Sequence, residues 1–348
     1  MKIITKALPV EDILVDLSKQ FKAPLEEDSG EFMFYIPEKY GEGYIRGTSF
    51  DSGIGIIEYR CTFYNDLKLI FAINQTHPLK FIFCSKGKID HAFEDDKDIH
   101  TIDTYQNIIV SSSGQKGHVL FFKANETVHI SSLEIVRKDF SSRNNYCFEG
   151  LDDKLKLLFK DSQAQEKFFY HGNYSIKAAD IVEEINEKEF NGFVRSIFLE
   201  GKLFEMLALQ INQYHDDNQL EGSSQILRRS DVEKVKKTID FIKKDLSQNY
   251  SVDFLAKEAG TNVNKLQDGF KHLYGLTVNK FMQQEKLEAA KGMLSNSEYN
   301  ISQIVQLIGL NNRSYFSKIF KEKYGVNPKH FLNTRSNRPE EEKDIDES

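Results

Sequence analysis

The pattern of apolar and polar residues divides the chain into parts. From about Tyr35 to Phe140, short runs such as "LKLIFAI" and "LKFIFCSKG" alternate or cluster β-branched and aromatic residues, with Gly, Asn, Asp or Ser between the runs. This pattern predicts short β-strands. We expect residues 1–150 to form a compact β-rich barrel or sandwich, and a barrel would be cupin-like.

The spacing of apolar residues changes at about Leu151. In "LDDKLKLLFK", "SIKAADIVEEINEKEF" and "SIFLEGKLFEMLALQINQYH" they recur every three or four positions, which predicts amphipathic helices over residues 151–215. The last helix carries an apolar seam that suits a homodimer built as a four-helix contact. The seam consists of Leu199, Leu203, Leu207 and Ile211. The alternative, that the seam packs on its own β-rich domain, is equally compatible with the pattern.

A polar stretch without periodicity, "DDNQLEGSSQ", predicts a linker at residues 216–229. Ser230 and Glu233 then stand at capping-box spacing before a new amphipathic helix, so a second, all-helical domain is expected at residues 230–335. Residues 336–348 are acidic and are expected to be disordered. The predicted fold class is α+β, with the strands confined to the N-terminal domain.

The C-terminal domain contains an internal repeat. "FLAKEAGTNVNKLQDGFKHLYG" aligns with "IVQLIGLNNRSYFSKIFKEKYG", and Gly260 lies 49 positions before Gly309 while Gly275 lies 50 before Gly325. Each copy reads as a short helix, a Gly-containing turn and a second helix, which is a helix-turn-helix unit. One long helix from about residue 278 to residue 294 joins the units. At ~1.5 Å per residue it spans about 25 Å, comparable with the ~34 Å between successive major-groove faces.

Each second helix of the repeat has an apolar face and a polar face. Winding the chain at the helical period places Tyr315, Phe316, Ile319 and Phe320 in the core. The opposite faces carry Lys, Arg, Asn, Gln and Ser, which suit base edges and phosphates, together with Asp268. We predict base contacts from Asn264, Lys265, Gln267, Lys271, Arg313, Ser314 and Lys318, and phosphate contacts from Ser317, Lys321 and Lys329.

The distribution of charge supports an anionic partner for one segment. The net charge is -7, but residues 1–229 hold 27 Lys+Arg and 36 Asp+Glu, whereas residues 230–336 hold 17 and 11. A basic helical face is usually only solvated. Two such faces at matched spacing within a net-basic segment favour DNA binding.

Other chemistry is weakly represented. Cys61, Cys84 and Cys147 form no metal-binding or disulfide pattern and are expected to be reduced core residues. Apolar runs and the N-terminus resemble neither a membrane span nor a signal peptide, so we expect a soluble, cytoplasmic protein. No catalytic motif appears. Histidines occur in the β-rich region at His77, His91, His100, His118 and His129, but their spacing does not predict a metal site or a cofactor.

Residues 230–335 resemble the DNA-binding domain of the AraC/XylS family of bacterial transcription regulators. The residues that carry the resemblance are the two repeats, "KLEAAKGML" between them, and the ending at Gly325, Pro328 and Phe331. Lys286 stands where Arg is usual and Leu310 where Phe is commoner. "KLQDGFKHLYG" and "FLEGKLFEMLAL" are similar to the pyochelin-regulator subgroup, whose members sense ferric siderophores. In particular, Gly269 costs a helix about 1 kcal/mol, so helix propensity alone would not select it.

The resemblance implies a ligand-responsive regulator, an activator that binds promoter DNA and contacts RNA polymerase. Its N-terminal domain is expected to bind a small-molecule effector or to mediate dimerisation, and a homodimer is expected. The effector and its binding residues cannot be assigned from the sequence. Two alternatives stay open. One is a metal-dependent cupin enzyme fused to a DNA-binding domain, and the other is an architectural DNA binder that responds to no effector.

Overall fold

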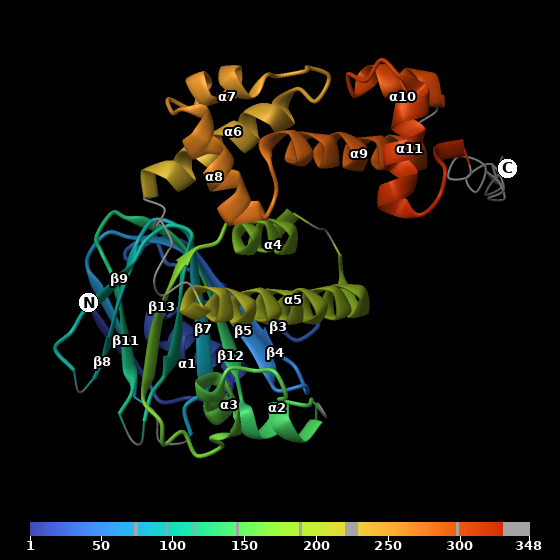
Figure 1. Ribbon diagram of the computed structural model, residues 1–348. Helices are drawn as coiled ribbons and strands as arrows, with labels where there is room; N and C mark the ends of the chain where they lie inside the picture. Colours follow the sequence, from blue (N-terminus) through green and yellow to red (C-terminus); the bar gives the residue numbers. More distant parts are fainter. Residues whose placement is uncertain are drawn as a thin grey trace, which may run out of the picture. The chain divides into compact units, whose positions relative to one another are not determined.

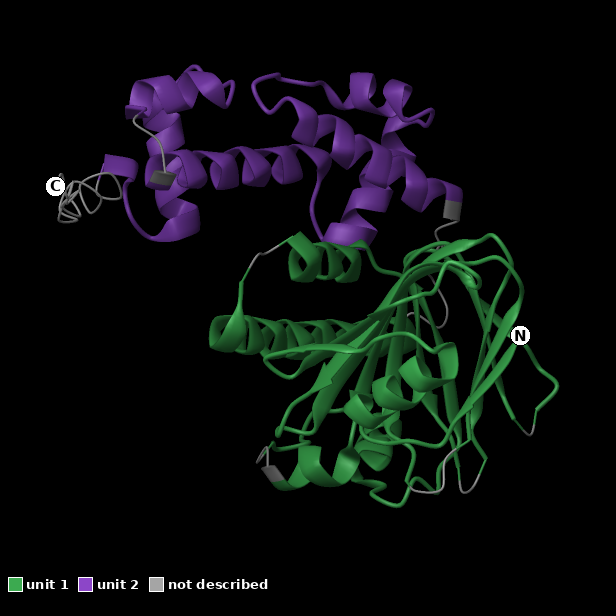
Figure 2. Ribbon diagram, turned by 180° about the vertical axis from the view of Figure 1, so that it is seen from behind, with its two compact units in different colours: residues 1–226 green, residues 227–348 purple. Residues whose placement is uncertain are grey.

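The computed structural model describes residues 1–72, 76–94, 96–113, 116–143, 146–187, 190–219, 229–296 and 299–329. The chain divides into two compact units, an N-terminal unit of residues 1–226 and a C-terminal unit of residues 227–348 (Figure 2). Residues 220–228 of the linker expected at 216–229, and the acidic tail expected at 336–348, lie outside the described residues.

The N-terminal unit contains all the described strands (Figure 1). Hydrogen bonds join these strands into a five-stranded sheet, β1-β6-β11-β8-β9, and an eight-stranded sheet, β13-β10-β7-β12-β5-β4-β3-β2. The bounds are β1 Lys2–Thr5, β2 Glu26–Asp28, β3 Glu31–Tyr35, β4 Gly41–Ser49, β5 Ile54–Phe63, β6 Leu67–Phe71, β7 Leu79–Lys86, β8 Ile89–Phe93, β9 His100–Ile102, β10 Gln106–Ser111, β11 His118–Phe122, β12 Thr127–Ile135 and β13 Phe168–Tyr174.

Strand alternation divides the core of this unit into two layers. On β7, Ile82 and Cys84 point into the space between the two sheets, whereas Phe81 and Phe83 point to the outer face. The inner layer also takes in Leu14 and other apolar residues of the first helix. The outer layer is covered by later helices. The helices of this unit are α1 Val10–Phe21, α2 Arg137–Arg143, α3 Asp153–Lys160, α4 Ile176–Glu187 and α5 Gly192–Gln219.

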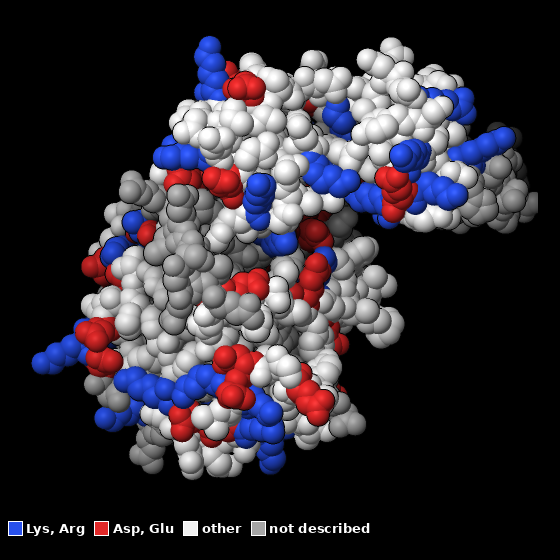
Figure 3. All heavy atoms as spheres, viewed as in Figure 1, with Lys and Arg blue, Asp and Glu red and all other residues white. Residues whose placement is uncertain are grey.

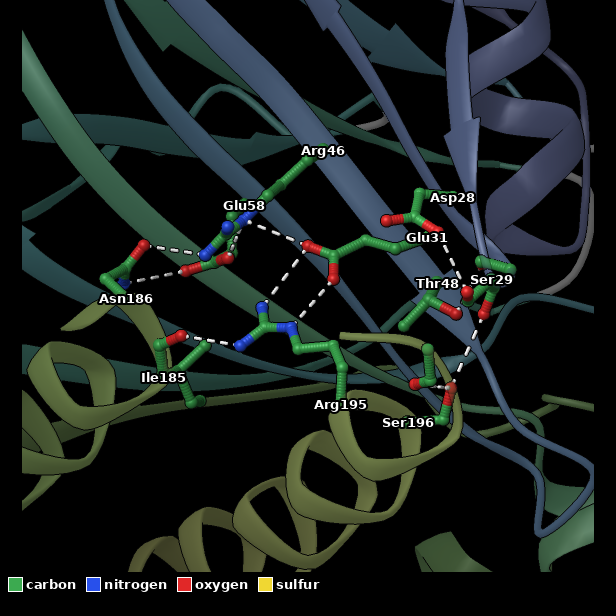
Figure 4. A network of polar contacts seen from close by, with 12 residues as sticks. Asp28, Ser29, Glu31, Arg46, Thr48, Glu58, Ile185, Asn186, Arg195 and Ser196 are labelled. Atoms are coloured by element: carbon green, nitrogen blue, oxygen red, sulfur yellow. Dashed lines mark hydrogen bonds and ion pairs between the residues drawn. The ribbon is translucent and has the colours of Figure 1, made fainter. Parts of the chain in front are cut away.

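An ion network attaches α4 and α5 to the eight-stranded sheet (Figure 4). Arg46 of β4 pairs with Glu58 of β5, with 2.5 Å between Nε and Oε2, and donates to the side chain of Asn186 in α4 at 2.6 Å. Arg195 of α5 donates to Glu31 of β3 at 3.1 Å and to the carbonyl of Ile185 at 2.7 Å. The helices are therefore held by directional contacts as well as by apolar packing.

The structure differs from the sequence-based expectations in local ways. Helix α1 lies in the segment expected to be β-rich, and β13 lies in the segment expected to be helical. Helix α5 continues to Gln219, beyond the expected start of the linker at residue 216. Cys147 is exposed, so only Cys61 and Cys84 are core residues.

The C-terminal unit is helical throughout its described residues. Its helices are α6 Arg229–Lys244, α7 Val252–Glu258, α8 Val263–Tyr274, α9 Val278–Asn296, α10 Ile301–Leu307 and α11 Arg313–Tyr324. The repeat extends to the helix caps. Asn262 at the start of α8 accepts a hydrogen bond from the Lys265 amide, and Asn312 at the start of α11 accepts one from the Tyr315 amide, both at 2.9 Å. Each helix ends at a left-handed glycine, Gly275 or Gly325.

Candidate nucleic-acid interface

The polar faces of α8 and α11 are open to solvent. Phe270 of α8 and Phe316 and Phe320 of α11 are completely buried, which fixes the orientation of each helix. The predicted DNA-contact residues on the opposite faces are exposed, except for Gln267 and Ser317, which are half-buried. The exposed ones are Asn264, Lys265, Lys271, Arg313, Ser314, Lys318, Lys321 and, beyond α11, Lys329. These side chains are therefore accessible to a ligand as large as a DNA duplex.

The cations on these two faces are uncommitted. Within the described residues, Lys271, Arg313, Lys318 and Lys321 make no ion pair, whereas Lys323 on the flank of α11 pairs with Glu288 at 3.0 Å. Figure 3 shows that basic side chains predominate among the charged ones over α9 and α11. Unpaired cations on an exposed helix face can neutralise phosphates without first breaking an internal contact.

Two residues on the helix faces depart from the expected arrangement. Tyr315 was expected in the core, but it is 47 % exposed and its hydroxyl accepts a hydrogen bond from Gln283 of α9 at 2.7 Å. The side-chain carbonyl of Gln267 accepts a hydrogen bond from the Val278 amide at 3.2 Å. The carbonyl oxygen of Gln267 is thereby engaged, which leaves its NH₂ group as the part available to a base.

Packing explains the glycine in the middle of α8. A Cβ placed on Gly269 would lie 2.6 Å from Cγ2 of Val235 in α6. Helix α8 therefore approaches α6 more closely than any side chain at this position would allow without a shift. The glycine that helix propensity disfavours is required by the contact that holds α8 against α6.

The seam predicted for a dimer is mostly buried within its own unit. Leu199, Leu203 and Leu207 are at most 4 % exposed and belong to the outer core layer, with Ile211 partly buried against it. The sequence left two alternatives for this seam, a dimer contact or packing on the chain's own β-rich domain. The burial of the leucines agrees with the second. A dimer contact through these three leucines would require them to leave that core.

The N-terminal unit contains a cluster of buried histidines, with His91 of β8 and His118 of β11 on the inner faces of their strands and His77, just before β7, near His118. His77, His91 and His118 are at most 1 % exposed, and their six ring nitrogens find no hydrogen-bond partner among the described residues. The rings of His91 and His118 are 5.4 Å apart, and the ring of Phe169 lies 5.8 Å from His91. Burial is the main cause that lowers the pKa of His77 to about 4 and that of His91 to about 3, so both are neutral at pH 7.

An ion pair lies near this cluster. Lys80 of β7 pairs with Glu134 of β12 at 2.7 Å, and the ammonium of Lys80 is 4.4 Å from the ring of Phe71, on which His118 stacks. Each of these histidines is isolated in the sequence, and the pairing of β8 with β11 brings His91 and His118 together. No three His, Cys, Asp or Glu side chains in the described part of the chain are arranged to hold a metal ion.

A search for spanning helices adds one finding. Over the described residues, the helices are too short or too polar to cross a lipid bilayer.

Comparisons with known proteins match both units. Residues 255–334 match the family described as "Helix-turn-helix domain", and residues 41–225, more than half of the chain, match "Regulatory protein PchR N-terminal domain". The transcriptional activator PerA of Escherichia coli O127:H6 is 28 % identical over 66 % of this chain and 86 % of its own length. The transcriptional activator AggR of Escherichia coli is 32 % identical over 29 % of this chain and 36 % of its own length.

Solved structures also match. Apo ToxT from Vibrio cholerae is 18 % identical with a TM-score of 0.34, covering 81 % of this chain and 97 % of that one. The DNA-binding domain of AdpA in complex with a target DNA is 18 % identical with a TM-score of 0.30, covering 31 % of this chain and 97 % of that one. The family matches confirm the resemblance drawn from the repeats. The chain belongs to the PchR family of regulatory proteins and is a DNA-binding transcription regulator of the AraC/XylS type.

Proposed function

We propose that this regulator activates transcription when a small-molecule effector binds between the two sheets of its N-terminal unit. The observation that carries the proposal is the set of six unpartnered nitrogens on His77, His91 and His118. Activation itself is supported by the relatives PerA and AggR, both described as transcriptional activators. Activation would involve contact with RNA polymerase at the bound promoter.

The energetics favour an occupant for the histidine cluster. A buried polar group without a partner costs about 1–3 kcal/mol, and the neutral imidazoles bring six such atoms. Each neutral ring has one donor and one acceptor nitrogen. A ligand with both donors and acceptors would therefore satisfy the cluster, and the rings of Phe169, His91 and His100 favour a flat, aromatic one.

A ferric siderophore is the first ligand to test, because of the resemblance to the pyochelin-regulator subgroup. The siderophore supplies the iron ligands itself, so the proposal needs no metal-binding cluster from the protein. The protein's part would be to stack on the aromatic portion of the ligand and to hydrogen-bond its polar edge.

Thermal unfolding of the full chain tests this proposal. We expect a ferric aryl siderophore at 100 times its dissociation constant to stabilise the wild-type protein by about 2.7 kcal/mol. His91→Phe and His118→Phe should remove this stabilisation, whereas His272→Phe, at an exposed position of α8, should retain it. Equal stabilisation of all four proteins would show that the ligand binds elsewhere. If no ligand of this class stabilised the wild-type protein, ordered water would be the only occupant of the histidine cluster.

We also propose that the regulator is a homodimer, with a contact on the exposed side of α5. Phe193 is 79 % exposed and Val194 and Ile197 are each 56 % exposed, on the face turned away from the buried leucines. Light scattering tests this surface. Phe193→Glu should yield monomers, and Leu157→Glu, at an exposed leucine on α3, should leave the dimer intact.

The two alternatives make different predictions. A metal-dependent enzyme would carry stoichiometric metal after purification, and an architectural DNA binder would show no response to any effector. We infer that the protein acts by binding rather than by catalysis, in the cytoplasm, because one unit matches a helix-turn-helix domain and the other the N-terminal domain of a regulatory protein.

A further inference from the structure

The two helix-turn-helix units contact each other through more than the long helix α9. The loop between α6 and α7 directly precedes the first helix-turn-helix unit, and hydrogen bonds to Asp245 hold its shape. The carboxylate of Asp245 accepts hydrogen bonds from the Ser247 amide at 2.9 Å and from the side chain of Gln248 at 3.1 Å. This loop, residues 245–251, reaches both α9 and the turn of the second unit.

Lys286 connects α9 to the loop. Its ammonium donates to the carbonyl of Gln248 at 3.1 Å and to Oδ1 of Asn249 at 2.9 Å. Lys286 is only 7 % exposed, and burial lowers its pKa. Burying a charged ammonium costs free energy unless hydrogen bonds compensate for the lost water. Here both acceptors come from one loop, so the ammonium of Lys286 holds that loop against α9.

Asn249 continues the connection into the second unit. While its Oδ1 accepts from Lys286, its Nδ2 donates to the carbonyl of Gly309, in the turn between α10 and α11, at 3.0 Å. A chain of hydrogen bonds therefore runs from α9 through the α6–α7 loop to the turn of the second helix-turn-helix unit. We call Lys286, Asn249 and Gly309 the clamp.

The two turn glycines of the repeat differ at this contact. Gly260 and Gly309 have nearly the same backbone angle, with φ of +67° and +68°. A Cβ on Gly260 would meet nothing within 4 Å, whereas a Cβ on Gly309 would lie 1.8 Å from the carbonyl oxygen of Ser247. Both glycines permit a left-handed turn, but Gly309 also permits the close approach of the two units.

Apolar packing does not fill the space beside the clamp. An open groove of about 450 Å³ lies there, lined mainly by polar side chains that include Gln248, Asn249, Gln283, Lys286 and Tyr315. The relative orientation of the two helix-turn-helix units is then fixed by α9 at one place and by the clamp at another. Two separated attachments restrain rotation about the axis of α9, which a single helical connection restrains less.

We propose that Lys286 and Asn249 are positioning residues that fix the spacing of the two DNA elements the protein reads. The inference rests on DNA binding by both units. When two binding modules are rigidly connected, the second binds at high effective concentration, but only if the sites are at the matching separation. A rigid clamp makes the protein intolerant of altered spacing.

The test uses the full chain and a DNA fragment selected for tight binding. Derivative fragments carry the two elements one or two base pairs closer or farther apart, and others have one element scrambled. For the wild type we expect a loss of about 30-fold in affinity on a two-base-pair change. For Lys286→Met we expect this loss to shrink to about threefold, with binding to single-element fragments within twofold of wild type.

Four further variants separate positioning from folding. Lys286→Arg keeps the charged donor and should restore strict spacing. Asn249→Ala breaks the connection to Gly309 from a loop and should act like Lys286→Met, even if the latter fails to fold. Gly309→Ala should relax the spacing, whereas Gly260→Ala, strained to the same degree by its backbone angle, should not.

One result would contradict the role of the clamp, and a different result would contradict tandem DNA reading itself. If folded Lys286→Met and Asn249→Ala keep the wild-type spacing dependence, the clamp does not set the spacing. If the wild type binds two-element and one-element fragments equally, tandem reading itself fails.

Discussion

Gly269 lies in the middle of α8, where helix propensity and packing oppose each other. Alanine would favour the helix by about 1 kcal/mol, but its Cβ would lie 2.6 Å from Val235. We expect Gly269→Ala to lower the free energy of unfolding by about 1–3 kcal/mol, since overpacking outweighs propensity. Gly292→Ala is the matched control in α9, where a Cβ meets nothing within 4 Å, and should raise stability by up to about 1 kcal/mol. Stabilisation by both variants in urea titrations would contradict the packing account.

Arg313 and Lys321 share α11, but they are predicted to act differently. Both are exposed and unpaired within the described residues. Arg313→Ala should cost about 1–3 kcal/mol of binding to the cognate site and relax the preference at one base pair, because a guanidinium can donate two hydrogen bonds to guanine. Lys321→Ala should weaken all sequences similarly. Binding titrations on cognate and scrambled DNA measure both, and equal losses on the two for Arg313→Ala would rule out base reading by that residue.

The buried histidines make stability depend on pH. Burial, followed by the nearby His100 and Lys80, lowers the pKa of His91 to about 3, while an unfolded histidine titrates near 6.5. The unfolded chain therefore binds a proton that the folded chain excludes, so stability is lost as the pH falls from about 6.5 toward about 3.

His91→Phe should reduce that dependence by about 1 kcal/mol between pH 6 and pH 5. His272→Phe removes an exposed histidine and should leave the slope unchanged. Urea unfolding at several pH values gives the slopes. Parallel curves for the wild type and His91→Phe would mean that His91 is protonated in the folded protein.

Both polar and apolar contacts attach α5 to the eight-stranded sheet. Its leucines pack on the outer core layer, and Arg195 joins it to β3 through Glu31. Arg195→Met should lower the free energy of unfolding by about 2 kcal/mol, because Glu31 is then left part-buried without that partner. Lys202→Met, which removes pairs with the more exposed Glu184 and Glu205, should cost less than about 1 kcal/mol. Equal losses in chemical unfolding would show that the network adds nothing beyond surface pairing.

Periodicity in the sequence predicted some elements and missed others for identifiable reasons. The repeat located α8 and α11 because their apolar residues, caps and terminal glycines all recur. Helix α1 was missed although Val10, Ile13, Leu14, Leu17 and Phe21 have helical spacing. Strand β13 was missed because its run of aromatic residues shows no alternation, and its partner β10 is distant in sequence.

The sequence predicted which residues of the candidate site are exposed, but it did not predict the packing contacts that hold the two helix-turn-helix units together. Outward residues such as Lys318 follow from the helical period alone. The contact of Gly309 with Ser247 depends on how two helix-turn-helix units pack, and no local pattern records it. The departure of Lys286 from the usual arginine was a visible signal, but its hydrogen bonds to the α6–α7 loop become apparent only in three dimensions.

At the level of the whole molecule, the division of charge matches the division into units. The net-acidic N-terminal residues disfavour a general DNA-binding surface, while the net-basic C-terminal unit carries the two helices, α8 and α11, that we propose read DNA. Because each uncommitted cation that meets a phosphate releases a counterion, the logarithm of affinity should fall steeply with the logarithm of salt concentration.

Selection of bound fragments from genomic DNA by the full chain, followed by a salt titration of the best fragment, tests the central claim most directly. Tandem reading predicts one enriched motif with two elements about 10 base pairs apart. It also predicts that the logarithm of affinity falls with the logarithm of salt concentration with a slope that corresponds to the release of several counterions. Enrichment of a single short element, or of no motif with and without added ferric siderophores, would contradict it.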